Sequence, residues 1–356
     1  MYLALYNSDR EHITNVVNAT YDKTERVYDP DSFSAEGVSS ENINDAKIVV
    51  ANDELGNYVY ACFADSITPD KNKRTVKGID FKTLWDTEIL LDYTAAGSFN
   101  GKLSAIFTKV KQLVFDGSDS AVKTVPVDVI IPEDSTDTTS VYGSYQGTYQ
   151  IVNAYTFLKC YLKYYEYNIE SRYDVASGKI IFTFAKHTDI VTVNLNDFIY
   201  ELTTSSSATN KAVATIKFDT ASGTARPSTI ATRYFYRNED NDIVMSDAVG
   251  NISGRIYPVK AKWFEAENLS DALFEAVYEL ANSRYVDNIV IDNNAVTDPI
   301  DLAEYPLYTK LELYYDGKLY KTLPISEKIT SLSSTGENTK VKLGFKKILL
   351  TEIIKK

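Results

Sequence analysis

The stretch KLELYYDGKLYKTL, residues 310–323, constrains the fold more than any other part of the chain. Apolar and polar residues alternate on both sides of the pair Asp316-Gly317. An Asp-Gly pair suits the positive φ angles of a two-residue type I′ turn, whose twist matches that of the flanking strands. Alternation of this kind puts successive side chains on opposite faces of a sheet. We therefore predict a β-hairpin with residues 316 and 317 as its turn.

The same pattern recurs along the chain. RYDVASGKIIFTF predicts a hairpin around Ser177-Gly178, and TRYFYRNEDNDIVMSD predicts another around residues 239–241. Residues 60–90 form the pattern of a strand, a charged turn, a second strand and then a helix. The 27 tyrosines fit this picture, because aromatic side chains favour a pleated, half-buried surface. The sequence thus indicates an α+β fold that is rich in strand.

Four segments are predicted to be helices. The first follows Asp80, whose carboxylate is suited to cap a helix, with Ile79 and Leu84 at the positions of a hydrophobic staple. The other three have apolar residues at helical spacing. They are NGKLSAIFTKVKQLVF with Asn100 as its cap, TYQIVNAYTFLKCYLKYYEY with Ile151, Ala154, Tyr155, Leu158, Leu162 and Tyr165 on one face, and LSDALFEAVYELANSRY with Ser270 as its cap.

Length and charge limit the classes of function. A chain of 356 residues suggests two or three domains. Its 37 basic and 49 acidic residues give a net charge of −12, whereas binding to nucleic acid through phosphates requires clustered Lys and Arg. We therefore expect no sequence-specific nucleic-acid binding. No stretch approaches the roughly 18 apolar residues of a membrane helix, and MYLALYNSDREH lacks the basic start of a secretory signal.

Residues suited to nucleophilic or metal chemistry are scarce. The two cysteines, Cys62 and Cys160, lie far apart in the sequence and are predicted to be small buried hydrophobic residues. The two histidines are His12 and His187, and His187 is predicted to lie on the surface at the end of a strand. Neither zinc-ligand spacing nor a phosphate-binding glycine motif occurs. We accordingly predict no catalytic, cofactor-binding or metal-binding residues, and no cofactor.

Acidic and aromatic clusters leave alternatives open. Asp65, Asp80, Asp86 and Glu88 are interpreted as one helix cap and a solvated face, and RNEDND at 237–242 as a turn rather than a calcium loop. The tyrosines of LKCYLKYYEY are interpreted as core residues rather than a surface that stacks on saccharides. A glycosidase that uses only two carboxylates stays possible, because Asp and Glu are too numerous to exclude one.

The order of these units resembles that of the baseplate hub, or tail-tip, proteins of tailed bacteriophages. This family includes the T4-type hub protein and the N-terminal hub part of tail-associated lysins and prophage tail endopeptidases. One departure is AEYPLYTKLEL, where the family has an L-G-D-x-V strand entry. The segments that carry the resemblance are ATYDKTERVYDPDSFSAEG, KRTVKGIDFKTLWDTEIL, LSDALFEAVYELANSRYVDNIVI and LYTKLELYYDGKLYKTLPISEKITSLSSTGENTKVKLGF.

The resemblance implies a β-rich α+β fold with two hub-type β-barrel domains and two smaller α+β domains. The first barrel would occupy residues 1–95 and be completed by about 190–220. An α+β domain would occupy 96–190. The second barrel would combine 221–265 with 305–356, around a small helix-strand domain at 266–304.

The resemblance also implies a function and partners. It predicts a structural protein of the phage tail tip that forms a homotrimer, contacts the distal tail protein, the tape measure protein and other baseplate proteins, and opens for DNA passage. The protein would be assembled in the host cytoplasm, reside in the virion and possess no enzymatic activity, since the sequence stops at ILLTEIIKK without a lytic domain. The alternatives are a tail-associated lysin that degrades cell walls, and a tail protein that binds a receptor or saccharide on the host cell surface.

Overall fold

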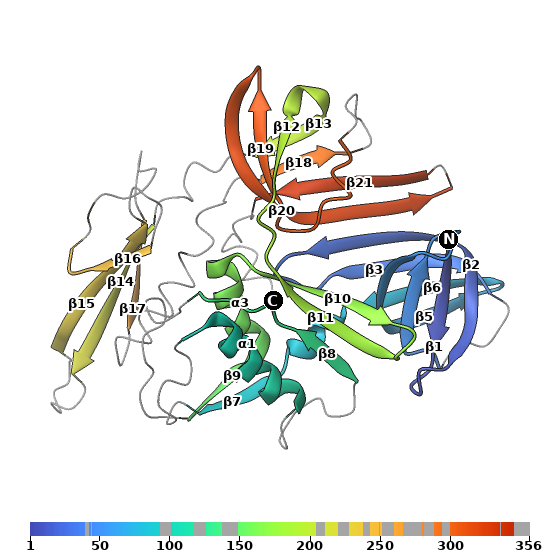
Figure 1. Cartoon of the computed structure of the whole chain (residues 1–356), viewed down its shortest axis with the longest axis horizontal. Coiled ribbons are helices and arrows are strands. Elements are labelled where there is room, and N and C mark those ends of the chain that lie inside the picture. Colours follow the sequence, from blue (N-terminus) through green and yellow to red (C-terminus); the bar gives the residue numbers. More distant parts are fainter. Residues whose placement is uncertain are drawn as a thin grey trace.

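The chain folds into one 12-stranded sheet, three smaller sheets and a small helical layer, as Figure 1 shows for the computed structural model. The 12-stranded sheet consists of a barrel and an open part, which we call the second sheet. The structure describes residues 1–39, 43, 45–92, 101–116, 126–136, 149–203, 211–219, 228–237, 243–248, 250, 260–265, 280, 288–293, 300–334 and 336–344. The elements below are those of the described residues.

The N-terminal strands form a closed barrel. Their order around the sheet is β1-β4-β5-β6-β3-β2, and β2 returns to pair with β1, so that every strand has two neighbours within the barrel. All six pairings are antiparallel. Closure removes the exposed sheet edges that favour aggregation. The strands are β1 (Tyr2–Tyr6), β2 (His12–Arg26), β3 (Ser32–Val38), β4 (Ile48–Asn52), β5 (Tyr58–Asp70) and β6 (Lys73–Ile79).

Close packing inside this barrel depends on Gly78 of β6. A Cβ atom added to Gly78 would lie 2.1 Å from the Sγ atom of Cys62 on β5. Cys62 is fully buried with a free thiol, which confirms the prediction that it is a small core residue. Its side chain therefore fills the space that the missing side chain of Gly78 leaves.

The C-terminal strands form a second, open sheet. The order is β12-β19-β20-β21-β18-β13, and β12 is joined to β13 through the 3₁₀ turn η3 (Leu195–Asp197). Within the described residues β12 pairs only with β19, and β13 only with β18. Among the described residues, no pairing joins β12 to β13 directly. The strands are β12 (Ile190–Asn194), β13 (Ile199–Thr203), β18 (Asn288–Asp292), β19 (Lys310–Tyr315), β20 (Lys318–Ser333) and β21 (Gly336–Leu343).

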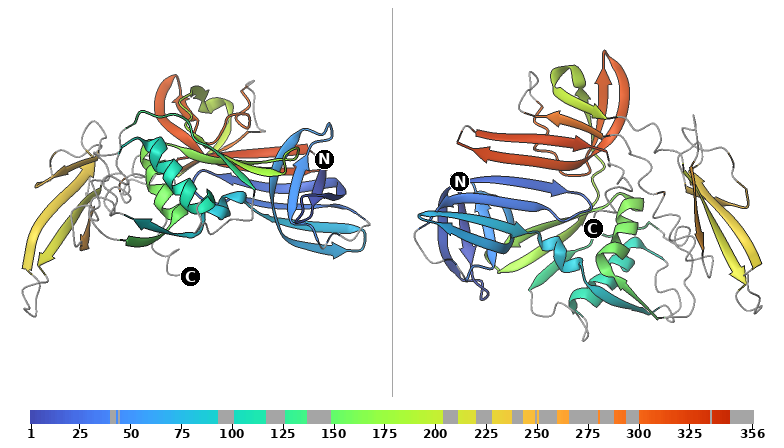
Figure 2. Two further views of the ribbon diagram at one scale, coloured as in Figure 1. Left: turned by 60° about the horizontal axis from the view of Figure 1, so that its bottom comes forward. Right: turned by 180° about the vertical axis from the view of Figure 1, so that it is seen from behind.

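The long strand β20 connects the two sets of strands. Its first part pairs with β19, and its second part pairs with β21 on one side and with β2 of the barrel on the other. The junction with β2 runs from the Tyr21–Leu332 pair to the Arg26–Glu327 pair. Figures 1 and 2 show the barrel and the second sheet side by side across this junction.

The middle of the chain forms a helical layer and two small sheets that pack beside the barrel (Figure 1). Strand β11 pairs with β10 and, in parallel, with β8, and β7 pairs with β9 as a ribbon. The elements are η1 (Phe81–Trp85), β7 (Glu88–Asp92), α1 (Leu103–Lys111), the π-helical turn η2 (Gln112–Asp116), β8 (Val127–Ile130), β9 (Tyr149–Asn153), α3 (Ala154–Tyr165), β10 (Asn168–Asp174) and β11 (Lys179–Ala185).

A fourth sheet lies at the opposite end of the molecule from the barrel (Figures 1 and 2). Its order is β16-β15-β14-β17, with β14 parallel to β17. Its strands are β14 (Lys211–Asp219), β15 (Ser228–Arg237), β16 (Ile243–Ser246) and β17 (Lys260–Glu265).

Two hydrophobic cores hold these units together. One fills the barrel, and the other joins the outer face of β1 and β4 to the helices, to β10 and β11 and to the second sheet. Trp85 of η1 is fully buried in the second core, where its ring packs edge-on against Phe115, Phe182 and Phe184. The single turn η1 therefore anchors the barrel to the helical layer.

The predicted helices are confirmed in part. Asp80 does cap a helix, by accepting from the Lys82 backbone N–H, but this helix is the short 3₁₀ turn η1. Helix α1 begins at Leu103 with Lys102 rather than Asn100 as its cap, and Asn100 lies outside the described residues. The segment around LSDALFEAVYELANSRY is described only at Leu280, which is buried and helical.

The third predicted helix is wrong over its first turn. Residues 149–153 form β9, because they pair with β7, and Asn153 caps α3 by accepting from the Thr156 N–H. Ile151 was expected on the apolar helix face but is 68% exposed on β9. The expected core residues Ala154, Tyr155, Leu158 and Leu162 are buried, and Tyr165 packs against the same core.

The strand pairings differ from the predicted barrel boundaries at two places. Residues 190–203 were expected to complete the first barrel, but β12 and β13 pair with β19 and β18 of the second sheet. The barrel needs no further strand, because β1 pairs with β2. Residues 221–265 were expected beside 305–356, but β15, β16 and β17 belong to the separate fourth sheet. The division of the chain into two barrel domains therefore stays a prediction.

The predicted hairpins are present. Asp316 and Gly317 have φ angles of +49° and +73° between the paired residues Tyr315 and Lys318, as a type I′ turn requires. Strands β10 and β11 meet around Ser177-Gly178, and β15 pairs with β16, whose connecting turn lies outside the described residues.

Replacing Gly317 with Val is expected to lower the free energy of unfolding by about 1–2 kcal/mol, because a left-handed backbone conformation is costly for a β-branched residue. No atom lies within 4 Å of a Cβ atom at this position, so backbone strain alone causes the loss. Urea unfolding followed by circular dichroism measures it. Gly317→Asn, which tolerates positive φ, is the control, and equal stability of all three proteins would contradict the hairpin.

Candidate functional site

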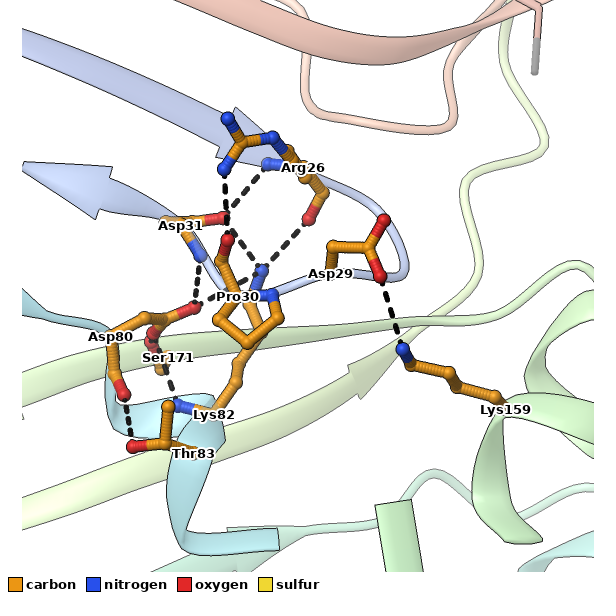
Figure 3. Close-up of polar contacts among 9 residues, drawn as sticks. All are labelled: Arg26, Asp29, Pro30, Asp31, Asp80, Lys82, Thr83, Lys159 and Ser171. Carbon is orange, nitrogen blue, oxygen red and sulfur yellow. Dashed lines mark hydrogen bonds and ion pairs between the residues drawn. The ribbon is translucent and has the colours of Figure 1, made fainter. Parts of the chain in front are cut away.

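Three ionisable side chains are buried together where the loop after β2 meets η1 (Figure 3). The side chains of Asp31, Asp80 and Lys82 are 7%, 0% and 3% exposed. The Lys82 ammonium donates to the Asp31 carboxylate at 3.0 Å and to the Arg26 carbonyl at 2.9 Å, and it lies 3.6 Å from the Asp80 carboxylate. We call these three residues the buried charge cluster.

Backbone and hydroxyl groups complete the buried charge cluster. Asp31 accepts from the Arg26 N–H at 2.8 Å and donates its own N–H to Asp80 at 2.9 Å. Asp80 also accepts from the Lys82 N–H at 3.1 Å and from the Ser171 hydroxyl of β10 at 3.2 Å. The cluster therefore ties the barrel both to η1 and to the neighbouring sheet, as Figure 3 shows.

The electrostatics of the cluster reflect its burial. Burial raises the pKa of Asp31 to about 7, and the positive charge of Lys82 partly opposes this rise. Burial lowers the pKa of Lys82, but the two carboxylates outweigh it and raise that pKa above its ordinary value. Lys82 is therefore charged at neutral pH. A fully hydrogen-bonded and buried group of this kind holds segments together and presents no open face to a substrate.

A second polar group lies at the junction of β2 and β20. Lys328 is buried, is paired in register with Glu25, and donates to the Ala303 carbonyl at 2.8 Å. Burial lowers the pKa of Lys328. Lys23 of β2 forms an ion pair with Glu25 at 3.0 Å. Charged and hydrogen-bonded side chains thus fix the register between the barrel and the second sheet.

Among the described side chains, Cys62, His12 and His187 each have other surroundings and no contact between a Cys and a His is found. Cys62 lies inside the barrel against Gly78. His12 contacts Asn15, whereas His187 follows β11, as predicted, and pairs with Glu170 at 2.7 Å. The side chain of Cys160 lies outside the described residues.

The structure places several of the acidic and aromatic residues for which the sequence left alternatives open. Asp80 is the cap that we predicted, and Asp86 is exposed and accepts from the Asn153 amide. Tyr161 and Tyr167 of LKCYLKYYEY are buried, which confirms the core interpretation for these two rings. Among the described residues, no group of three or more His, Cys, Asp or Glu could hold a metal ion, and residues 238–242 of RNEDND are not described.

Sequence reasoning missed Asp31 and Lys82. A Lys in the first turn of a helix is ordinarily solvated, so neither apolar spacing nor a motif marks Lys82 as buried. The one available signal is the acidic pair in VYDPDS, which follows a strand and is close to no basic residue other than Arg26.

The described helices are too short or too polar to cross a membrane. Comparison of the sequence with family models and with curated proteins finds no match. The fold, in contrast, matches solved structures over nearly the whole chain.

Three of these structures are tail proteins, two of them from prophages. The 43 kDa tail protein of prophage MuSo2 from Shewanella oneidensis is 14% identical, with a TM-score of 0.56 over 96% of this chain and 98% of that chain. A tail protein from Neisseria meningitidis MC58 is 10% identical, with a TM-score of 0.53 over 97% and 96%. Prophage tail protein gp18 from Listeria monocytogenes EGD-e is 9% identical, with a TM-score of 0.53 over 99% and 97%. The chain therefore has the tail-protein fold that its sequence predicted.

Proposed function

We propose that this chain, which has the fold of tail proteins that include two prophage proteins, is a structural protein of a phage tail tip. The observation that carries this proposal is the extent of the match. It covers 96–99% of this chain and 96–98% of the three tail proteins, so it includes both β-rich units and the elements between them. A shared domain inside otherwise different proteins would give a shorter match.

We further propose that the protein acts as a hub. Three copies would form a ring at the distal end of the tail tube, contact the distal tail, tape measure and other baseplate proteins, and open for DNA passage. A rigid structural role of this kind is supported by the interior of the protein, where the buried charge cluster and β20 fix the barrel to the neighbouring elements. The protein would reside in the virion after assembly in the host cytoplasm.

Light scattering on the purified protein tests the hub. The expected mass is three times the 39.9 kDa of one chain at micromolar concentration. Negative-stain images of the same sample are expected to show threefold particles. A mass of one chain across this concentration range would contradict the trimer, and a separate pull-down with the distal tail protein would then decide whether the tail-protein proposal itself survives.

The purified protein is expected to release no soluble fragments from host cell walls, because the structure brings no Cys–His pair together among its described residues. The assay is turbidity loss and release of muropeptides or peptides at micromolar protein. Lysozyme is the positive control. Release that disappears when one Asp or Glu is changed to its amide would support the alternative, a tail-associated lysin.

A further inference from the structure

The buried charge cluster holds an amine and a carboxyl group together away from water. The Lys82 nitrogen lies 3.0 Å from the Oδ1 atom of Asp31, and the two side chains are 3% and 7% exposed. Phe81 and Trp85, which flank Lys82 on η1, are fully buried apolar residues. An amine and a carboxyl group fixed at this distance within one molecule have an effective concentration far above any concentration reached in solution.

The cluster holds more carboxylates than cations. Among the described residues, the ion pairs of Asp31 and Asp80 both involve Lys82, whereas the Arg26 guanidinium pairs with Glu327. A buried carboxylate is costly to keep charged. Burial raises the pKa of Asp31 to about 7, although Lys82 opposes the rise. The protonated acid, which is the form that an amine can attack, is therefore present near neutral pH.

The groups around Asp31 match the requirements of amide formation. The Oδ1 atom of Asp31 accepts from the Arg26 N–H at 2.8 Å, and a donor at this oxygen stabilises the negative charge that develops when an amine adds to the carboxyl carbon. The Oδ2 atom of Asp80 lies 3.6 Å from the Lys82 nitrogen, so Asp80 can accept the proton that an ammonium must lose before it attacks. Figure 3 shows Arg26, Asp80 and Lys82 gathered around Asp31.

We propose that Lys82 and Asp31 condense to an amide that covalently joins the loop after β2 to η1. Asp80 takes a proton from the Lys82 ammonium, the free amine adds to the Cγ atom of protonated Asp31, and the bond from Cγ to the departing hydroxyl group breaks. The products are one amide, one water molecule and a protonated Asp80. Atoms and charge therefore balance, and neither an oxidant nor a co-reactant is needed.

The choice of Asp31 over Asp80 as the linked acid follows from the geometry. Asp80 is only two residues from Lys82 and already caps η1 by accepting from the Lys82 N–H, whereas Asp31 is closer to the Lys82 side-chain nitrogen. Freshly made chains hold the ion pair, and the linked form accumulates afterwards, because Lys82 must first lose a proton. The linked form encloses β3, β4, β5 and β6 in one covalent loop between residues 31 and 82.

Intact mass spectrometry of the unfolded protein tests the reaction. After the folded protein has been stored near neutral pH, its mass is expected to fall by one water molecule. Protein stored in concentrated urea keeps its full mass, since the cluster exists only in the folded chain. In a tryptic digest, peptides 27–47 and 78–102 are expected to be joined, with fragment ions that place the bond between Asp31 and Lys82.

Two variants separate the reaction from the ion pair. Lys82→Arg keeps a buried cation, but its guanidinium stays protonated and is not a nucleophile, so the full mass is expected. Asp80→Asn removes the proton acceptor and is expected to slow the loss of water at least about a hundredfold. Thermal melting verifies that both variants are folded. The exposed ion pair of Lys159 and Asp29, at 3.1 Å, is an internal control that is expected to stay unlinked.

The outcomes decide the inference without reference to the phage tail. A wild-type chain that keeps its full mass near neutral pH would overturn it, even if Asp80→Asn does not fold. Loss of water that also occurs in Lys82→Arg would overturn it too, because the dehydration would then lie elsewhere, as in a cyclic imide at Asp316-Gly317. Joined peptides that are absent from Lys82→Arg and from the urea sample support it. Mass and trimer formation are independent measurements, so this inference and the proposed function can fail separately.

Discussion

The variant Lys82→Met is expected to lose about 3–5 kcal/mol of the free energy of unfolding at pH 8, because it removes the one cation from the buried charge cluster. Asp31 and Asp80 then face each other in the interior, and the Arg26 carbonyl loses its donor. Loss of a single partner from a buried ion pair is costly, since the remaining charge stays desolvated. Urea unfolding at equilibrium measures the change.

The loss should be smaller at pH 5. Burial already raises the pKa of Asp31 from its ordinary 3.8 to about 7, and Lys82 opposes that rise. Without Lys82 the folded state binds a proton at this site still more tightly than the unfolded state does. A raised pKa in the folded state means that stability increases as pH falls, so protonation offsets part of the damage.

The control for this experiment is Lys159→Met. Lys159 pairs with Asp29 of the same loop at 3.1 Å, but the Asp29 side chain is 69% exposed. An exposed ion pair contributes at most about 1 kcal/mol to the free energy of unfolding, so Lys159→Met is expected to have a small effect at both pH 5 and pH 8. If Lys82→Met and Lys159→Met lowered the free energy of unfolding by the same small amount, the buried charge cluster would not be what holds the barrel to the helical layer.

The variant Gly78→Ala is expected to destabilise the barrel by about 3 kcal/mol, the upper end of the range for overpacking a core. The added methyl group would lie 2.1 Å from the Cys62 Sγ atom, a distance that requires strands to move. Thermal and urea unfolding measure the loss. Thr68→Ala, at an exposed position on β5, is expected to have little effect.

A second substitution tests the cause of this loss. Cys62→Ala removes the clashing sulfur atom, after which the nearest side-chain atom to the new methyl group is the Cβ atom at 3.2 Å. The double variant should therefore recover part of the stability that Gly78→Ala loses. Absence of any recovery would mean that the strain arises from the backbone and not from the contact with Cys62.

The local parts of the fold were predictable from the sequence. Asp316-Gly317 specifies its own turn, and the cap of η1 needs only Asp80 and the backbone beside it. Strand β9 was not predictable, because Ile151 lies at helical spacing from Ala154 and Tyr155. Its pairing with Leu90 on β7, far earlier in the chain, overrides that pattern.

The candidate sites depend on contacts that are distant in sequence. Asp31 and Lys82 are separated by 51 residues, and only the folded chain brings them within 3.0 Å. The place of β12 and β13 in the second sheet was not predictable for the same reason, since they pair with strands about a hundred residues later.

The closure of the first barrel by β1 and β2 has a consequence for biosynthesis. All six strands lie within residues 2–79, so the barrel can form on the ribosome while most of the chain is still unmade. The second sheet must wait, because β12 and β13 precede the entire fourth sheet and their partners follow it. Such distant pairings form slowly. The nascent chain therefore carries an unprotected, apolar edge until β18 and β19 emerge, which makes this interval of translation the one most exposed to misassembly.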